Sequence, residues 1–133
     1  MTRLLWPLAG LVVAAALLAA GCGGEPEPTV YRLEPTRACL EQTGLEPTTA
    51  NVDFVASTAT GGAVRAEIAA NEVTISFGET DEEAQRTARA YENFAGPRIP
   101  IEHVLFREHN AVLVWGAPPT DEERTRVVSC LSA

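Results

Sequence analysis

The residues that could carry out chemistry are few in this 133-residue chain and lie far apart. His103 and His109 are the only histidines; His103 falls within an expected strand and His109 within an expected turn. Neither has a second metal-ligand side chain four residues away, so the sequence does not predict a zinc site. A hydrolase or redox enzyme would need one of them to meet an acid or a thiol. Because the sequence shows no catalytic constellation, we predict that the chain is not an enzyme and assign it no catalytic residue, metal or cofactor.

Two acidic clusters, residues 80–83 and 120–123, have the same sequence Thr-Asp-Glu-Glu. Calcium would need six or more oxygen ligands from a loop with a tight glycine turn, and neither cluster has one. A threonine followed three residues later by glutamate is typical of a capping box at the start of a helix, where carboxylates also favour the helix dipole. We therefore interpret both clusters as helix starts.

The first 22 residues have the layout of an export signal. Arg3 precedes an uncharged stretch that ends Leu18-Ala19-Ala20-Gly21-Cys22. This ending resembles the lipobox of bacterial lipoproteins. The resemblance implies that Cys22 carries a diacylglycerol and becomes the N-terminus once residues 1–21 are removed. Two alternatives stay open: an uncleaved N-terminal anchor, and an ordinary signal cut near Gly21 that leaves Cys22 unmodified.

The resemblance also bears on the pairing of the other two cysteines. If Cys22 is lipidated, Cys39 and Cys130 remain as an even pair in an oxidising compartment, and we predict that they form a disulfide. Closing the loop between Cys39 and Cys130 with a disulfide would stabilise the fold by about 4–5 kcal/mol in the chain-entropy model. The alternative, a reactive thiol, lacks a C-x-x-C pattern and has no histidine nearby in the sequence.

The charge of the chain excludes several partners. The net charge is −8, and all ten basic residues are arginine. A protein this acidic is repelled by nucleic acid and by anionic lipid. We therefore predict that it is attached to the membrane through the N-terminal lipid alone. The absence of lysine also excludes a Schiff-base or phosphate-loop lysine.

The chain divides into a signal peptide at residues 1–21, a tether at residues 22–30 and one domain at residues 31–133. The glycines, prolines and glutamates of the tether favour an extended linker, and the rest is long enough for one core. The expected elements are, in order, a helix over residues 36–42, a strand over 52–56, a hairpin over 64–77, a helix after Thr80, a hairpin over 101–115 and a helix after Thr120. The hairpin over 64–77 is expected to have one buried and one solvated face. The inner face of the helix after Thr80 is expected to carry Ala84, Ala88, Tyr91 and Phe94 or Ala95.

Hairpin and helix thus occur twice in the same order, as tandem units that arose by duplication or by convergence on one capping sequence. We predict an α+β fold with one antiparallel sheet of about five strands and the helices on one face.

The second hairpin carries apolar residues on both faces, unlike the first. We identify Val104, Phe106, Leu113 and Trp115 as a candidate surface for a partner protein. The alternative is that other parts of the chain cover this face.

The sequence therefore predicts a lipid-anchored lipoprotein on the extracytoplasmic face of the cell membrane. Its expected role is that of a non-catalytic binding or accessory module, with an envelope protein as partner. The alternative is a carrier of a small ligand, which would need an apolar pocket between the sheet and the helices. The small alanines expected inside the helix after Thr80 favour close packing and argue against such a pocket.

Overall fold

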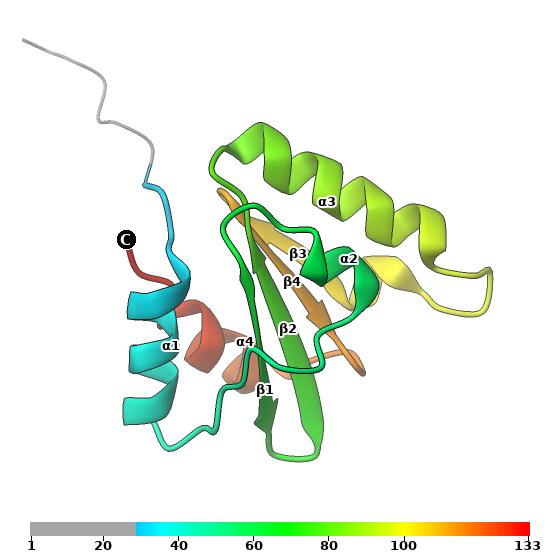
Figure 1. Cartoon of the computed structure of the whole chain (residues 1–133). Helices are drawn as coiled ribbons and strands as arrows, with labels where there is room; N and C mark the ends of the chain where they lie inside the picture. Colours follow the sequence, from blue (N-terminus) through cyan, green and yellow to red (C-terminus); the bar gives the residue numbers. More distant parts are fainter. Residues whose placement is uncertain (1–28) are drawn as a thin grey trace, which may run out of the picture.

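The computed structural model describes residues 29–133 (Figure 1). The predicted signal peptide, the predicted lipidation site Cys22 and most of the predicted tether lie outside these residues. The helices are α1 (Leu33–Gln42), α2 (Phe54–Ser57), α3 (Asp81–Phe94) and α4 (Asp121–Val128); the strands are β1 (Ala63–Ile68), β2 (Asn71–Phe77), β3 (Leu105–Glu108) and β4 (Ala111–Trp115), with a short 3-10 turn, η1 (Ile101–His103), before β3. The predicted α+β class is confirmed.

The four strands form one antiparallel sheet in the order β1-β2-β4-β3. Each hairpin pairs with itself, and β2 pairs with β4 in a register that places Val73 opposite Trp115 and Phe77 opposite Ala111. The two hairpins therefore lie side by side, with β2 and β4 in the centre. The prediction of about five strands is one strand too many.

The missing strand was predicted over residues 52–56, where the single helical turn α2 (Phe54–Ser57) forms instead. Asp53 decides the outcome, because its Oδ1 accepts a hydrogen bond from the Ala56 N–H at 2.9 Å. Aspartate is one of the preferred residues at this capping position. In a segment so short, alternation of apolar residues does not distinguish a strand from one turn of helix.

Helix α1 begins at Leu33, three residues earlier than predicted. Pro35 occupies its third position, where an N–H would have no partner within the helix, so proline is tolerated there.

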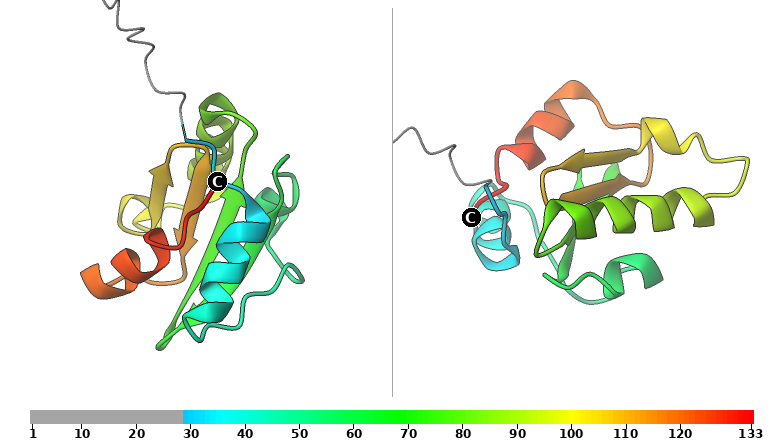
Figure 2. Two further views of the ribbon diagram at one scale, coloured as in Figure 1. Left: turned by 90° about the vertical axis from the view of Figure 1, so that its left-hand side faces the viewer. Right: turned by 90° about the horizontal axis from the view of Figure 1, so that it is seen from above.

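The helices cover both faces of the sheet, which corrects the prediction that they lie on one face. On one side Leu40 of α1 and Val127 of α4 pack with Ile75 and Leu113 in the main core. On the other side Ala84 and Tyr91 of α3 pack with Val112 and with Val55 of α2. Figure 2 shows α2 and α3 on one side of the sheet and α4 on the other. The molecule is therefore a three-layer arrangement of helix, sheet and helix.

The layer formed by α2 and α3 buries a face of the first hairpin that was expected to be solvated. Thr74 and Ser76 of β2 were expected on a solvated face, but both are buried beneath α2 and α3. Polar side chains on that face stay at least partly exposed on the edge strands, at Arg65 and Glu67 of β1 and at Arg107 of β3. A central strand needs cover on both faces whatever its sequence alternation suggests.

A clasp joins the two ends of the described chain. Cys39 and Cys130 form the predicted disulfide, with their Cα atoms 5.3 Å apart. The Arg32 N–H donates to the Ser132 carbonyl at 2.7 Å, and the Ser132 N–H donates to Thr36 Oγ1 at 3.2 Å. The clasp holds α1 and the C-terminal segment together, on the side of the molecule where the tether joins.

Two asparagines, 39 residues apart in the sequence, each fasten a hairpin to a distant segment. The fully buried Asn110 donates from Nδ2 to the carbonyls of Tyr31 and Gly78 and accepts the Tyr31 N–H at Oδ1. Asn71 exchanges hydrogen bonds of about 3 Å with the backbone N–H and carbonyl of Ala117 in the same way. Asn110 therefore ties the root of the tether to the sheet and to the loop before α3.

The hairpin–helix order recurs as predicted, but the two helix starts differ in detail. Thr120 and Glu123 form a complete capping box. At α3, Thr80 caps the helix, but the Glu83 carboxylate accepts from the Glu79 N–H and the Thr60 hydroxyl, each at 2.6 Å. The bond from Thr60, then that from Glu79, lowers the pKa of Glu83 below its ordinary value of 4.5. Glu83 thus joins α3 to the loop after α2.

We expect Asn110→Ala to destabilise the fold by about 3 kcal/mol, because it leaves the part-buried backbone groups of Tyr31 and the buried carbonyl of Gly78 without these partners. Asn71→Ala is the matched control, and its more exposed bonds should cost about 1 kcal/mol. Urea unfolding of both variants measures the difference. Equal losses would show that Asn110 does not fasten the N-terminal segment.

Candidate functional site

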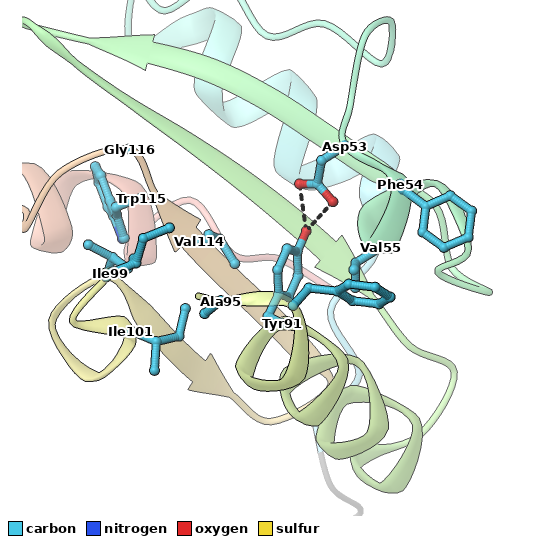
Figure 3. A pocket seen from close by; sticks show the side chains of 12 residues that line it. Asp53, Phe54, Val55, Tyr91, Ala95, Ile99, Ile101, Val114, Trp115 and Gly116 are labelled. Atoms are coloured by element: carbon cyan, nitrogen blue, oxygen red, sulfur yellow. Dashed lines mark hydrogen bonds between the residues drawn. The ribbon is translucent and has the colours of Figure 1, made fainter. Parts of the chain in front are cut away.

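An apolar groove of about 640 Å³ lies on the α2 and α3 side of the sheet (Figure 3). One wall is α2 with its capping residue Asp53, and another is the last turn of α3. The far end is formed by Ile99, Ile101 and the end of β4 at Trp115. Segments that are distant in the sequence therefore meet around one hollow.

The rim of the groove carries the exposed apolar side chains. Within residues 29–133, three large hydrophobic side chains are exposed: Phe54 at 73%, Phe94 at 71% and Ile99 at 53% of their surface. All three line this groove. The rings of Phe54 and Phe94 meet edge to face, with centroids 6.4 Å apart and an interplanar angle of 80°. Apolar side chains that gather in this way mark binding sites more often than scattered ones do.

The floor of the groove is buried. Val55, Tyr91, Val104 and Trp115 line it from below, and each is less than a tenth exposed. The indole Nε1–H of Trp115 is buried and has no hydrogen-bond partner among the described residues. A buried donor without a partner costs free energy in the empty protein. The groove is thus recessed, with a buried floor below an exposed rim.

The helix pattern explains why space remains here. The inner stripe of α3 places Ala84, Ala88 and Tyr91 against the sheet. After Tyr91 the next inward position is the small Ala95, and Phe94 lies outside the stripe. No large side chain of the last turn of α3 therefore fills the space beside the end of β4.

Asp53 and Tyr91 form the polar contact of the groove. The Tyr91 hydroxyl donates to the Asp53 carboxylate, at 2.8 Å from Oδ2 and 3.0 Å from Oδ1, as the dashed lines in Figure 3 show. Burial raises the pKa of Tyr91 well above its ordinary value of 10, and the bond to Asp53 and the charge of Asp53 raise it further. The phenol therefore stays protonated and holds the carboxylate in place.

This arrangement does not form a nucleophile–base pair. Tyr91 keeps its proton, and Asp53 is the only charged side chain that lines the groove. The two histidines lie elsewhere: His109 packs edge-on against Tyr31, and His103 is exposed in η1 rather than in the strand predicted for it. Within residues 29–133 no group of three or more histidine, cysteine or acidic side chains is placed to hold a metal ion.

The surface predicted for a partner protein is wrong as an exposed patch. Val104, Leu113 and Trp115 are buried, and Phe106 is half-buried under the Arg124 guanidinium, which lies 4.3 Å from its ring centre. Helices α1 and α4 cover this face, so the alternative of internal cover applies. Val104 and Trp115 nevertheless reach the groove, as part of its floor.

No pattern in the sequence predicted the rim of the groove. Phe54 was predicted in a strand over residues 52–56 and Phe94 or Ala95 on the inner face of a helix, while Ile99 was not singled out. The strong N-terminal capping preference of Asp53 could have shown that residues 54–57 are helical, which would have moved Phe54 outward.

Comparison with known proteins identifies no relative: no protein-family model, curated protein or solved structure matches this chain. Within the described residues no helix is long and apolar enough to cross a membrane.

We expect the stability of the protein to fall as the pH rises above about 10. The folded state holds the Tyr91 proton while the unfolded chain releases it at the ordinary pKa of 10, so the stabilisation is complete below pH 10 and is lost above it. Urea midpoints at pH 8 and pH 11 measure the effect, and the absence of lysine limits other titrations in this range. Tyr91→Phe should remove most of the pH dependence, since Tyr31 is common to both proteins. An unchanged dependence in the variant would contradict the assignment.

Proposed function

We propose that this chain is a lipid-anchored, non-catalytic binding module of the bacterial cell envelope that accepts an apolar group in the groove beside α2 and α3. The observation that carries the proposal is the position of Phe54, Phe94 and Ile99, since every exposed large hydrophobic side chain of the described residues lies on this one rim. Exposed aromatic rings add nothing to the core, so a use outside the fold accounts for them better than packing does.

The shape of the groove supports a binding role. Its volume of about 640 Å³ is within the range of about 300–1,000 Å³ that is typical of small-molecule sites, and such sites combine an apolar lining with few polar groups. This recessed shape also favours the alternative function, a carrier for a small apolar molecule.

The membrane part of the proposal rests on residues 1–22, whose resemblance to a lipoprotein signal supplies the anchor. A diacylglycerol on Cys22 has two acyl chains, and two chains hold a protein on a membrane where one does not. The tether joins the domain at Tyr31, which Asn110 links to Gly78 just before α3. The groove lies at the other end of this 14-residue helix, about 20 Å away. A domain held in this way would present its groove away from the point of attachment.

We expect 1-octanol to bind in the groove of the full chain in phospholipid nanodiscs. The reporter is the indole N–H resonance of Trp115, which the variant Trp115→Phe assigns; empty nanodiscs correct for partition into lipid. Phe94→Ser should weaken binding by about tenfold, because it removes apolar contact area from an exposed rim position, and should leave the melting temperature unchanged.

Asn93→Ser, one residue earlier on the exposed side of α3, is the matched control and should bind octanol as the unmodified chain does. Equal octanol affinity in the Phe94→Ser and Asn93→Ser variants, or no saturable binding by the unmodified chain, would refute the proposed binding site.

We expect the mass spectrum of the protein extracted from membranes to show a chain that begins at Cys22 and carries a diacylglycerol. Cys22→Ala should abolish this modification and leave residues 1–21 attached. A mature chain that begins at an unmodified Cys22 would show that the signal is of the ordinary secreted type.

A further inference from the structure

We propose that the groove binds a small amphiphile whose alkyl or aromatic part covers the apolar floor and whose positively charged headgroup lies against the Asp53 carboxylate. This inference rests on the proposed function and adds the chemical class of the ligand.

The charges around the groove favour a cation. Of the side chains that line the groove, Asp53 alone is charged, and no arginine or histidine is among them. Asp53 forms no ion pair with any arginine of the described residues, although glutamates elsewhere pair with Arg37, Arg65, Arg86 and Arg124. The whole chain has a net charge of −8, so its field also attracts cations and repels anions. A fatty-acid anion would thus meet a like charge beside Asp53.

The carboxylate is held ready for such a headgroup. The Ala56 N–H and the Tyr91 hydroxyl fix its orientation, and both contacts involve Oδ1, while Oδ2 accepts only from Tyr91. A carboxylate offers about four acceptor positions, so Oδ2 keeps one free on an exposed residue. A charged group that is fixed in advance loses little conformational entropy when a ligand binds.

Helix capping does not by itself explain a charged residue here. Asparagine and serine cap helices about as well as aspartate, and either can accept a hydrogen bond from the Tyr91 hydroxyl. What aspartate adds at residue 53 is a negative charge at the mouth of an apolar hollow. The substitution Asp53→Asn therefore separates the charge from the cap.

The shape of the site favours a small molecule over a protein surface. The buried side chains of Val55, Val104 and Trp115 form the floor below the exposed rim of Phe54, Phe94 and Ile99. A chain of about eight carbons enters such a hollow, whereas a stable protein interface spreads over roughly 800 Å² on each partner.

The test compares octylammonium, 1-octanol and octanoate, which share an eight-carbon chain and differ in charge. Each is titrated into the full chain in zwitterionic nanodiscs at pH 7.5 and low salt, with the Trp115 indole resonance as readout. We expect octylammonium to bind most tightly and octanoate most weakly, with at least a tenfold difference between them. Sodium chloride at 0.5 M should reduce this difference several-fold, because the headgroup and Asp53 are exposed to solvent.

In Asp53→Asn the ratio of octylammonium to octanoate affinity should fall to within about twofold of one. Asp121→Asn, which removes an exposed carboxylate from the first turn of α4, is the matched control and should keep the ratio of the unmodified chain. If the asparagine variant unfolds, Asp53→Ser supplies the same comparison with a different capping residue.

The outcomes separate the two proposals. If octanol binds in the groove but octylammonium and octanoate bind equally well, or if Asp121→Asn lowers the ratio as much as Asp53→Asn does, the inference about the headgroup is wrong and the binding function stands. If none of the three molecules shifts the Trp115 resonance in a saturable way, the proposed function fails as well.

Discussion

The central constraint on this fold is that its two middle strands, β2 and β4, are buried on both faces. Ile75 and Leu113 face one core, while Ser76 and Val112 face the other. A sheet of this kind is stable only when both faces are covered, so the chain must supply two helical layers. The recurring hairpin–helix unit meets this need by sending α3 to one face and α4 to the other.

The two layers are not equally complete, and the groove follows from the difference. The layer of α1 and α4 is secured by the disulfide and by the hydrogen bonds between the chain ends, and Leu113 is fully buried there. The opposite layer consists of α3 and the single turn α2. Beyond the end of α3, beside its C-cap Ala95, the end of β4 borders the groove on this side of the sheet.

The predictable parts of this structure depend on neighbours in the sequence. The caps at Thr80 and Thr120 and the alternation of the first hairpin are local signals, and the elements they indicate are present. The groove is different, because it joins Phe54 to Phe94 across 40 residues of chain. The sequence does not show on which side of the sheet a helix will pack, so a side chain that is apolar by type could not be assigned to the rim. The same limit explains why Trp115 was predicted on an outer surface.

The proposed function depends on whether an amphiphile occupies the groove in the expected orientation. Intermolecular nuclear Overhauser effects between octylammonium and the full chain, with labelled methyl groups and aromatic rings, measure this directly. We expect contacts from the end of the octylammonium alkyl chain to Ile101, Val104 and Trp115. We expect the carbon next to the nitrogen to contact Phe54, which lies beside Asp53. Contacts confined to the layer of α1 and α4, or the reverse orientation in the groove, would contradict this expectation.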